Sequence, residues 1–492
     1  MKKIERKEFI KLSLMSSAAL YLSSCGANGD KKITNKDSVK TVAKIDTIAP
    51  EQIQAQPITP TFKLYKKGDS EYDILRKGFN KRIEQFPAAI ALCKTTEEVS
   101  QAVHYGIENK LPISIKSGGH SFEGFSGNND GLVINLSEMN EISWNNEETI
   151  SVGPGCKLSE LYDATLPKNK ILPAGSCGGV GVGGLALGGG YGFFSRKYGL
   201  TCDSLLELTM VDGKGNIVKT TEEKELLWAC KGGGNGNFGV ITNMKFKLKA
   251  APEFFQSYRF KTKNVPVEKA QEVLEKWFTI TANLPLSCFS AFVLNGNFLY
   301  ILLTNYETKV EGLSNIINQL SAIVDSTSVG TKTPLSRALK VFYGRPNPLN
   351  FKNSSAGFYK NYDDIKNCIA AVLEKVIHTP GMIYQINTLG GMVNNPGLAL
   401  KSSYSHRDQN YLSELQSYWD NNSREEKMIR NFEEVQQLFY ENGIRKQYRN
   451  YPDIHFKNYE NAYYGDNYLR LQKVKLKYDP DNIFDYAQGI KG

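Results

Sequence analysis

The segment 175–194, GSCGGVGVGGLALGGGYGFF, constrains the fold of the chain more than any other stretch of the sequence. Ten of its 20 residues are glycine, and one cysteine, Cys177, stands near its start. Each glycine inside a helix or strand costs about 0.5–1 kcal/mol relative to alanine, so this composition predicts a loop rather than a regular element. The glycines would let the backbone approach a ligand closely, and ligand binding would offset their entropic cost.

The same segment contains the pattern G-x-G-x-x-G at Gly179, Gly181 and Gly184, and Asp203 lies about where a ribose-binding acid would follow. A Rossmann dinucleotide site needs a strand before this pattern and a helix that opens at its third glycine. Four further glycines between positions 188 and 192 fall where that helix should run. We therefore reject the Rossmann interpretation and favour a loop whose N–H groups face the phosphates and carbonyls of a large cofactor.

The first 25 residues have the pattern of a lipoprotein-type signal peptide. A basic start is followed by a short apolar stretch and by Leu-Ser-Ser-Cys at 22–25, which resembles a bacterial lipobox. The apolar stretch is far shorter than the roughly 20 residues that a membrane-spanning helix needs. We expect an exported lipoprotein, anchored by a lipid on Cys25 at the periplasmic or cell-envelope face. A twin-arginine-like ERKEFIK, with Lys7 in place of the second arginine, leaves both export routes open.

Composition argues against two other classes of function. The net charge is +9 over 492 residues, and no Lys/Arg cluster with interleaved aromatic residues occurs, so no nucleic-acid partner is predicted. The eight cysteines form no C-x-x-C and the five histidines no H-E-x-x-H, so no metal site is predicted.

The chain changes character along its length, which predicts three parts after a flexible tether at 26–60. Residues 61–252 are glycine-rich with mixed helix and strand patterns, and 253–444 have the pattern of an antiparallel sheet backed by helices. Asn295-Gly296 between two apolar runs predicts a hairpin within that sheet. Residues 445–492 are aromatic and charged and are expected to return to the first part. Amphipathic helices are expected over 267–282, 310–324 and 424–443.

Several segments, taken in order, identify a family. They are ISIKSGGHSFEGFSG, GPGCKLSELY, the glycine segment, LLWACKGGGNGNFGVIT, YRNYPD and YYGDNYLRLQKVKLKYDPDNIF. Together they resemble the FAD-linked oxidoreductases of the vanillyl-alcohol-oxidase fold, in the berberine bridge enzyme-like branch, over about 86–250 and 445–490. The resemblance implies an α+β fold with a PCMH-type FAD-binding domain at 61–252, a substrate domain at 253–444 and a berberine-bridge-like segment at 445–492.

The resemblance also implies that FAD is attached by two covalent bonds. The histidine of S-G-G-H would bond the flavin C8 methyl group, and the cysteine of the glycine segment would bond ring carbon C6; here these are His120 and Cys177. A neutral imidazole can add to the oxidised methyl group, and a thiolate is a soft nucleophile for an electron-poor ring. Further contacts, mostly from backbone groups, are expected from Ser117, Gly118, Gly119, Ser121, Gly181, Gly184, Gly239 and Ile241.

Two further expectations concern the reaction. Val180 stands where the family gates oxygen beside flavin C4a, and its small side chain indicates an oxidase. The second tyrosine of Y-x-N-Y would take the substrate proton, which maps the base onto Tyr451, with Tyr448 and Asp453 nearby. Because an unperturbed tyrosine has a pKa of about 10, we expect neighbours that lower the pKa of Tyr451.

The sequence thus predicts an FAD-dependent oxidase that transfers hydride from an alcohol carbon to flavin N5. A carbohydrate hydroxyl is the first candidate for the substrate, and molecular oxygen is the expected acceptor. Two alternatives stay open: oxidative cyclisation or tailoring of a secondary metabolite, and a non-catalytic ligand-binding lipoprotein that keeps the fold.

Overall fold

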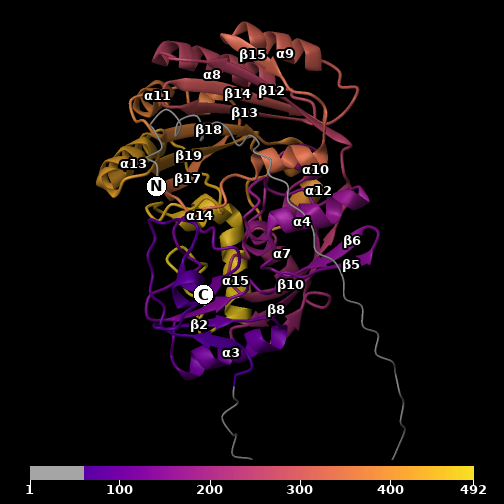
Figure 1. Cartoon of the computed structure of the whole chain (residues 1–492), viewed down its shortest axis with the longest axis vertical. Coiled ribbons are helices and arrows are strands. Elements are labelled where there is room, and N and C mark those ends of the chain that lie inside the picture. The colour runs from indigo at the N-terminus through magenta and orange to yellow at the C-terminus, as the bar shows by residue number, and fades with distance from the viewer. Residues whose placement is uncertain (1–59) are drawn as a thin grey trace, which may run out of the picture. The chain divides into compact units, whose positions relative to one another are not determined.

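Four β-sheets and their covering helices make up residues 60–492, the part of the chain that the computed structural model describes (Figure 1). The predicted signal peptide at 1–25 and tether residues 26–59 lie outside these described residues. Residues 61–492 cluster as one unit by their contacts. Within this unit, no helix is both long and apolar enough to cross a membrane.

A small sheet carries the S-G-G-H segment at the end of one of its strands. Its order is β1-β2-β4-β3, and β2, β4 and β3 are parallel neighbours. The strands are β1 (Lys63–Tyr65), β2 (Ala89–Leu92), β3 (Ile113–Lys116) and β4 (Leu132–Asn135). Helix α3 (Thr96–Glu108) connects β2 to β3, as a parallel pair requires, and buries Val99, Ala102 and Val103 with the sheet.

The second sheet is antiparallel throughout and follows the order β5-β6-β10-β8-β9. Its strands are β5 (Ile142–Asn146), β6 (Thr149–Val152), β8 (Leu205–Asp212), β9 (Ile217–Lys219) and β10 (Gly239–Lys247). Two further short strands, β7 (Lys170–Ile171) and β11 (Lys249–Ala250), form a separate antiparallel pair. The short helices of this part are α2 (Tyr72–Arg76), α4 (Leu158–Thr165), α5 (Val182–Leu187), α6 (Ser195–Tyr198) and α7 (Lys224–Cys230).

The largest sheet has the order β15-β12-β14-β13-β18-β19-β17, with β16 paired to β12, and every pairing is antiparallel. Its strands are β12 (Phe254–Thr262), β13 (Cys288–Asn295), β14 (Phe298–Asn305), β15 (Ser326–Val329), β16 (Thr333–Pro334), β17 (Asn350–Tyr359), β18 (Met382–Thr388) and β19 (Tyr411–Trp419). Asn295 pairs with Phe298 across the tight turn, which confirms the predicted hairpin.

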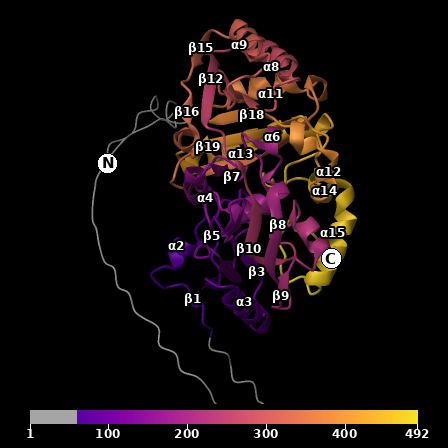
Figure 2. The ribbon, with the colours of Figure 1, turned by 90° about the vertical axis from the view of Figure 1, so that its right-hand side faces the viewer.

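Helices cover one face of this large sheet and leave the other face for the first part of the chain (Figures 1 and 2). The covering helices are α8 (Val267–Thr281), α9 (Leu313–Ala322), α11 (Ile369–Ile377) and α13 (Glu425–Glu441). Successive side chains of a strand point to opposite faces. Phe292 and Leu294 of β13 therefore join the helix-side core, whereas Phe289 and Val293 pack with residues of the glycine segment. The expected antiparallel sheet backed by helices is confirmed.

The C-terminal residues run back along the first part of the chain. Helices α14 (Tyr459–Tyr464) and α15 (Tyr468–Tyr478) follow the Y-x-N-Y segment, and α15 lies beside α7. The buried Lys475 Nζ donates to the carbonyl oxygen of Asn237 at 2.9 Å and to Asp479 at 2.6 Å. The bond to Asn237 ties the last helix to residues 226–242, and the bond to Asp479 pairs the buried ammonium group with a carboxylate.

Candidate active site

The S-G-G-H loop and the glycine segment touch each other backbone to backbone. A Cβ atom on Gly118 would lie 2.3 Å from the amide nitrogen of Gly181, and one on Gly181 would lie 2.5 Å from the nitrogen of Gly118. Gly119 has a φ of +69°, a conformation that side chains disfavour. Glycine is therefore required here by contact within the protein, in addition to any contact with a ligand.

His120 is brought close to the glycine segment by this contact. A Cβ atom on Gly179 would lie 3.1 Å from His120 Nε2, and the imidazole stacks on Phe79 with ring centroids 4.3 Å apart and planes at 14°. Burial, with a smaller effect of the Lys157 charge, lowers the pKa of His120 to about 4. The imidazole is therefore neutral at pH 7 and keeps a nitrogen lone pair for bond formation.

Cys177 differs from the other cysteines of the described chain. Its side chain is solvent-exposed, whereas the remaining six among residues 60–492, Cys93, Cys156, Cys202, Cys230, Cys288 and Cys368, are buried. Desolvation by the surrounding protein, with the negative charge of Glu414 adding to it, raises the pKa of Cys177 to about 11. The thiol is accessible but protonated at neutral pH, so its reaction requires a base.

Part of the glycine segment is helical, contrary to the expectation of a loop. Helix α5 buries Val182, Ala186 and Leu187 in the main core, and this tertiary burial outweighs the helix cost of its glycines. Gly184 differs from its neighbours because no heavy atom lies within 4 Å of a Cβ placed on it. It therefore borders open space.

A polar atom without a partner lies beside that open space. Asn235 Nδ2 donates to the carbonyl oxygen of Gly184 at 2.8 Å, while Asn235 Oδ1 is buried without a hydrogen-bond partner among the described residues. A buried oxygen of this kind is costly unless a ligand or water satisfies it. The unfilled Cβ position and the unpaired oxygen fit a large polar cofactor such as FAD at this place.

The end of the glycine segment packs against the Y-x-N-Y segment. A Cβ atom on Gly188 would lie 2.0 Å from Asn450 Oδ1, and Asn450 Nδ2 donates to the carbonyl oxygen of Leu185 at 3.0 Å. The Tyr448 hydroxyl accepts a hydrogen bond from the Gly190 amide at 2.9 Å. Tyr448 therefore holds the glycine segment in place, and its hydroxyl is already used for that purpose.

Tyr451 lies in an aromatic cluster next to these segments. Its ring stacks on Phe122 at 5.3 Å and 11°, and it meets Tyr448 edge to face at 5.0 Å. Burial raises the pKa of Tyr451 well above 10, and Tyr191 and Glu414 raise it further. The expected lowering of this pKa is wrong for the structure, because the groups that act most strongly on the phenol are tyrosines and a carboxylate.

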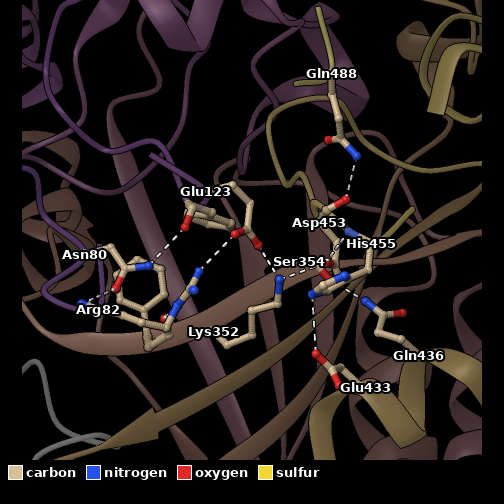
Figure 3. Close-up of polar contacts among 12 residues, drawn as sticks. Asn80, Arg82, Glu123, Lys352, Ser354, Glu433, Gln436, Asp453, His455 and Gln488 are labelled. Carbon is tan, nitrogen blue, oxygen red and sulfur yellow. Dashed lines mark hydrogen bonds and ion pairs between the residues drawn. The ribbon is translucent and has the colours of Figure 1, made fainter. Parts of the chain in front are cut away.

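Asp453 does not act as a free carboxylate beside Tyr451. It is buried, and its Oδ1 accepts from Lys352 Nζ at 2.7 Å and from the amide of His455 at 3.1 Å (Figure 3). The structure therefore places it in a buried ion pair with Lys352.

Glu414, which lies in β19, is a site residue that the sequence did not predict. The side chain is 7% exposed, and burial raises its pKa to about 8. Its charge acts on Cys177, Tyr191 and Tyr451. The only available signal was a carboxylate inside the strand YLSELQSYW, whose leucine and aromatic residues indicate burial.

Glu414 belongs to a row of polar side chains on the sheet face that the helices leave open. We call this row the polar floor; by strand register and alternation it comprises Asn353, Gln385, Asn387, Glu414, Gln416 and Tyr418. Asn353 donates to the Tyr418 hydroxyl at 2.9 Å, and that hydroxyl donates to Gln416 at 3.2 Å. Asn387 donates to the Tyr191 hydroxyl at 2.9 Å, which joins the floor to the glycine segment.

The other predicted cofactor contacts have local partners. The Ser117 hydroxyl bonds the Pro154 carbonyl, Ser121 Oγ accepts from the Phe125 amide at 3.0 Å, and the Val180 amide donates to the Cys177 carbonyl at 3.2 Å. Ile241 is buried in β10. Gly239 begins β10, where a Cβ atom would lie 2.4 Å from the Val211 carbonyl, so neighbouring strands explain this glycine.

Asp203, the residue of the rejected Rossmann pattern, forms a buried ion pair. Its two carboxylate oxygens accept from Arg407 at 2.9 and 2.7 Å. Across residues 60–492, no three His, Cys, Asp or Glu side chains gather in a way that could hold a metal ion.

Comparison with protein families matches two separate regions of the chain. An FAD binding domain matches residues 87–221, and a berberine and berberine-like segment matches residues 447–491. The first contains His120 and the whole glycine segment, and the second contains Tyr448, Tyr451 and Asp453.

Individual relatives match over nearly their whole length. An uncharacterised FAD-linked oxidoreductase of Bacillus subtilis, YgaK, is 29% identical over 87% of this chain and 97% of its own. Glucooligosaccharide oxidase of Sarocladium strictum is 29% identical over 87% of this chain and 92% of its own. The solved structure of a chitooligosaccharide oxidase superposes with a TM-score of 0.79 at 27% identity, covering 87% of this chain and 97% of that one.

The PCMH-type fold, the order of the segments and both family matches agree with one another. The chain combines an FAD binding domain with a berberine and berberine-like segment, and it is an FAD-linked oxidoreductase.

Proposed function

We propose that this protein is an oxidase that uses FAD to convert a hydroxyl group of a saccharide to a carbonyl group. The observation that carries the proposal is the polar floor beside Cys177 and Tyr451. Its amides, carboxyl group and phenol offer both donors and acceptors on one sheet face, as a substrate with many hydroxyl groups requires. Relatives named as glucooligosaccharide, chitooligosaccharide and carbohydrate oxidases support the same substrate class.

We propose that His120 and Cys177 hold FAD covalently. When bound, FAD supplies the two-electron acceptor for the hydride of the alcohol carbon. The neutral imidazole and the exposed thiol lie on two loops that touch each other at Gly118 and Gly181. Gly184 and Asn235 border the open space beside them and would contribute backbone and amide contacts.

We propose that Tyr451 accepts the hydroxyl proton of the substrate. Because its pKa is raised in this structure, a second group must share that proton, and Glu414, with a pKa of about 8, is placed to do so. The Glu414 carboxyl group keeps its own proton below about pH 8, and its deprotonated form becomes available to accept a proton as the pH rises toward and above that value. Glu414 is thus the second candidate for the base.

We propose molecular oxygen as the acceptor of the two electrons, with hydrogen peroxide as the product after two protons are added. The small side chain of Val180, three residues after Cys177, is the feature that supports this proposal. Replacement by leucine should slow re-oxidation by oxygen and leave reduction by substrate nearly unchanged. An equal effect on both half-reactions would contradict the oxygen role.

We also propose that the protein is exported and carries a lipid on Cys25. The test is fractionation of cells that express the full chain, with Cys25→Ser as the comparison. Wild-type protein should partition with membranes and lack its first 24 residues, and the variant should lose the lipid. An intact N-terminal methionine on cytoplasmic protein would contradict export.

One screen tests the catalytic proposal as a whole. Purified protein is mixed with monosaccharides, oligosaccharides and aromatic alcohols, and release of hydrogen peroxide is measured. Oxidation of oligosaccharides in preference to aromatic alcohols is expected. Turnover of aromatic compounds alone would favour tailoring of a secondary metabolite, and a colourless protein without flavin would favour ligand binding without catalysis.

A further inference from the structure

Four buried or nearly buried charges form a row of ion pairs, in the order Arg82, Glu123, Lys352 and Asp453 (Figure 3). Lys352 Nζ bonds both Glu123 and Asp453, the latter at 2.7 Å, and Arg82 bonds the other oxygen of Glu123 at 2.9 Å. The side chains of Glu123, Lys352 and Asp453 are 4%, 2% and 2% exposed. Positive and negative groups alternate along this row, so each of the four charges has a partner.

The partners of Lys352 come from segments that are far apart in the sequence. Glu123 lies three residues after His120, and Asp453 lies two residues after Tyr451. Lys352 itself belongs to β17 of the large sheet. One ammonium group therefore joins the loop that carries His120 to the segment that carries Tyr451, and fastens both to the sheet.

Lys352 cannot be a substrate contact of the polar floor. Asn353, the next residue of β17, lies on the floor, and alternation along the strand places Lys352 on the opposite face. There its Nζ lies 5.7 Å from the ring centroid of Phe432 in α13. Any effect of Lys352 on the reaction must pass through its partners.

Residues close to Glu123 and Asp453 in the sequence connect these two partners of Lys352 to the site. Phe122, which precedes Glu123, stacks on Tyr451, and its carbonyl oxygen accepts from Asn80 Nδ2 at 3.0 Å. The Tyr451 carbonyl oxygen accepts from the Ser355 amide at 2.9 Å, three residues along β17 from Lys352. The charges, the ring stack and the backbone bond thus restrain the same two segments.

We infer that Lys352 is a positioning residue that sets the placement of Tyr451 relative to His120. This inference rests on the proposed roles of His120 and Tyr451. Buried ion pairs contribute little net stability after desolvation, and their directional bonds can instead select one arrangement of the segments they join. Here that arrangement aligns the proposed flavin attachment with the proposed base.

The test compares the full-length holoenzyme with the variants Lys352→Met and Lys352→Met/Asp453→Asn. The double variant leaves no unpaired charge, because Arg82 still pairs with Glu123 and residue 453 is neutral. Hydrogen exchange of residues 117–127 and 448–455 is measured together with the ratio of His120-linked to Cys177-linked flavin in peptides. The rate of flavin reduction is measured at saturating substrate.

Both variants should show faster exchange in the two segments together and a lower share of His120-linked flavin. Flavin reduction should slow by about 10²-fold, the scale of an ångström-sized misplacement, with a smaller change in KM. Lys352→Arg, which keeps the charge, should recover part of the rate. If the double variant matches wild type in exchange and in flavin linkage, Lys352 only neutralises charge and the inference is wrong.

Lys475→Met is the matched control, because this substitution also removes a fully buried ion pair, the one between Lys475 and Asp479. It should increase exchange around its own contacts and leave the linkage ratio unchanged. If Lys352→Met and Lys475→Met change hydrogen exchange and the flavin linkage ratio in the same way, the cause is general destabilisation and the inference is wrong. Wild-type protein without covalent flavin would instead contradict the proposed function, while the exchange measurement would still test the tie between the segments.

Discussion

Phe122 stacks on Tyr451 with ring centroids 5.3 Å apart and planes 11° from parallel. Phe122 follows His120 by two residues, and Tyr451 lies 331 residues after His120 in the sequence. The stack therefore joins the loop of the proposed flavin histidine to the segment of the proposed base. This relationship explains why changes in either segment are expected to affect the other.

Tyr451→Phe removes one oxygen atom and keeps the ring that stacks on Phe122. Flavin content and thermal stability should stay close to wild type, while flavin reduction slows by about 10²–10⁴-fold if the phenol transfers the proton. Stopped-flow measurement of reduction and re-oxidation separates the two half-reactions. Reduction at the wild-type rate would assign the proton to another group, with Glu414 the next candidate.

Tyr448→Phe is the control for the tyrosine prediction. Its hydroxyl accepts from the buried Gly190 amide, so its loss should reduce the free energy of unfolding by about 1–3 kcal/mol. Flavin reduction should change much less than in Tyr451→Phe. Denaturant unfolding and stopped-flow reduction on the same preparations make the comparison. A larger loss of rate in Tyr448→Phe than in Tyr451→Phe would reverse the two roles.

Glu414→Gln should alter the pH dependence of stability. Burial raises the folded-state pKa of Glu414 from 4.5 to about 8, so the folded protein keeps a proton that the unfolded chain releases. Its contribution to stability is fully present below pH 4.5 and is lost as pH rises toward 8, at up to about 1.4 kcal/mol per pH unit.

The measurement for Glu414 is urea unfolding of cofactor-free protein between pH 5 and pH 8. The difference between wild type and Glu414→Gln should change steadily over this range, whereas the exposed Glu311→Gln should follow wild type. A difference that is constant with pH would show that Glu414 titrates normally. In the holoenzyme, Glu414→Gln should also flatten the rise of the reduction rate toward pH 8.

Cys177→Ala and His120→Ala should each leave one covalent bond to the flavin. Peptide mass spectrometry should find flavin on the 120-containing peptide in the first variant and on the 177-containing peptide in the second. The double variant should release its flavin on acid precipitation. Release of free flavin from wild-type protein would contradict both assignments.

Two glycine substitutions separate cofactor contact from contact within the protein. Gly184→Ala adds a methyl group into space that no described atom occupies, within a helix, so cofactor-free protein should unfold at an unchanged or slightly higher temperature. Its flavin incorporation should fall if the cofactor fills that space. Gly118→Ala places Cβ 2.3 Å from the Gly181 nitrogen and should destabilise the protein even without flavin. Normal flavin incorporation by Gly184→Ala would exclude close contact there.

Local sequence patterns by themselves determined much of the fold. The Asn295-Gly296 hairpin and the helices α8, α9 and α13 are predictable, because turn chemistry and apolar periodicity act within a few residues. The motifs around His120, Cys177 and Tyr451 likewise identify the family and its cofactor. Helix α5 is not predictable in this way, because the burial of Val182 and Leu187, a tertiary effect, outweighs the local glycine penalty.

Only the tertiary structure decided which side chains meet. Asp453 is close to Tyr451 in the sequence, yet its carboxylate turns to Lys352 and leaves the aromatic cluster. Glu414 gave little sign of function in a strand of unremarkable pattern, but sheet register places it on the polar floor and burial raises its pKa toward neutrality. Motif spacing reports contacts within a segment, whereas burial and pKa depend on atoms that folding brings together from distant parts of the chain.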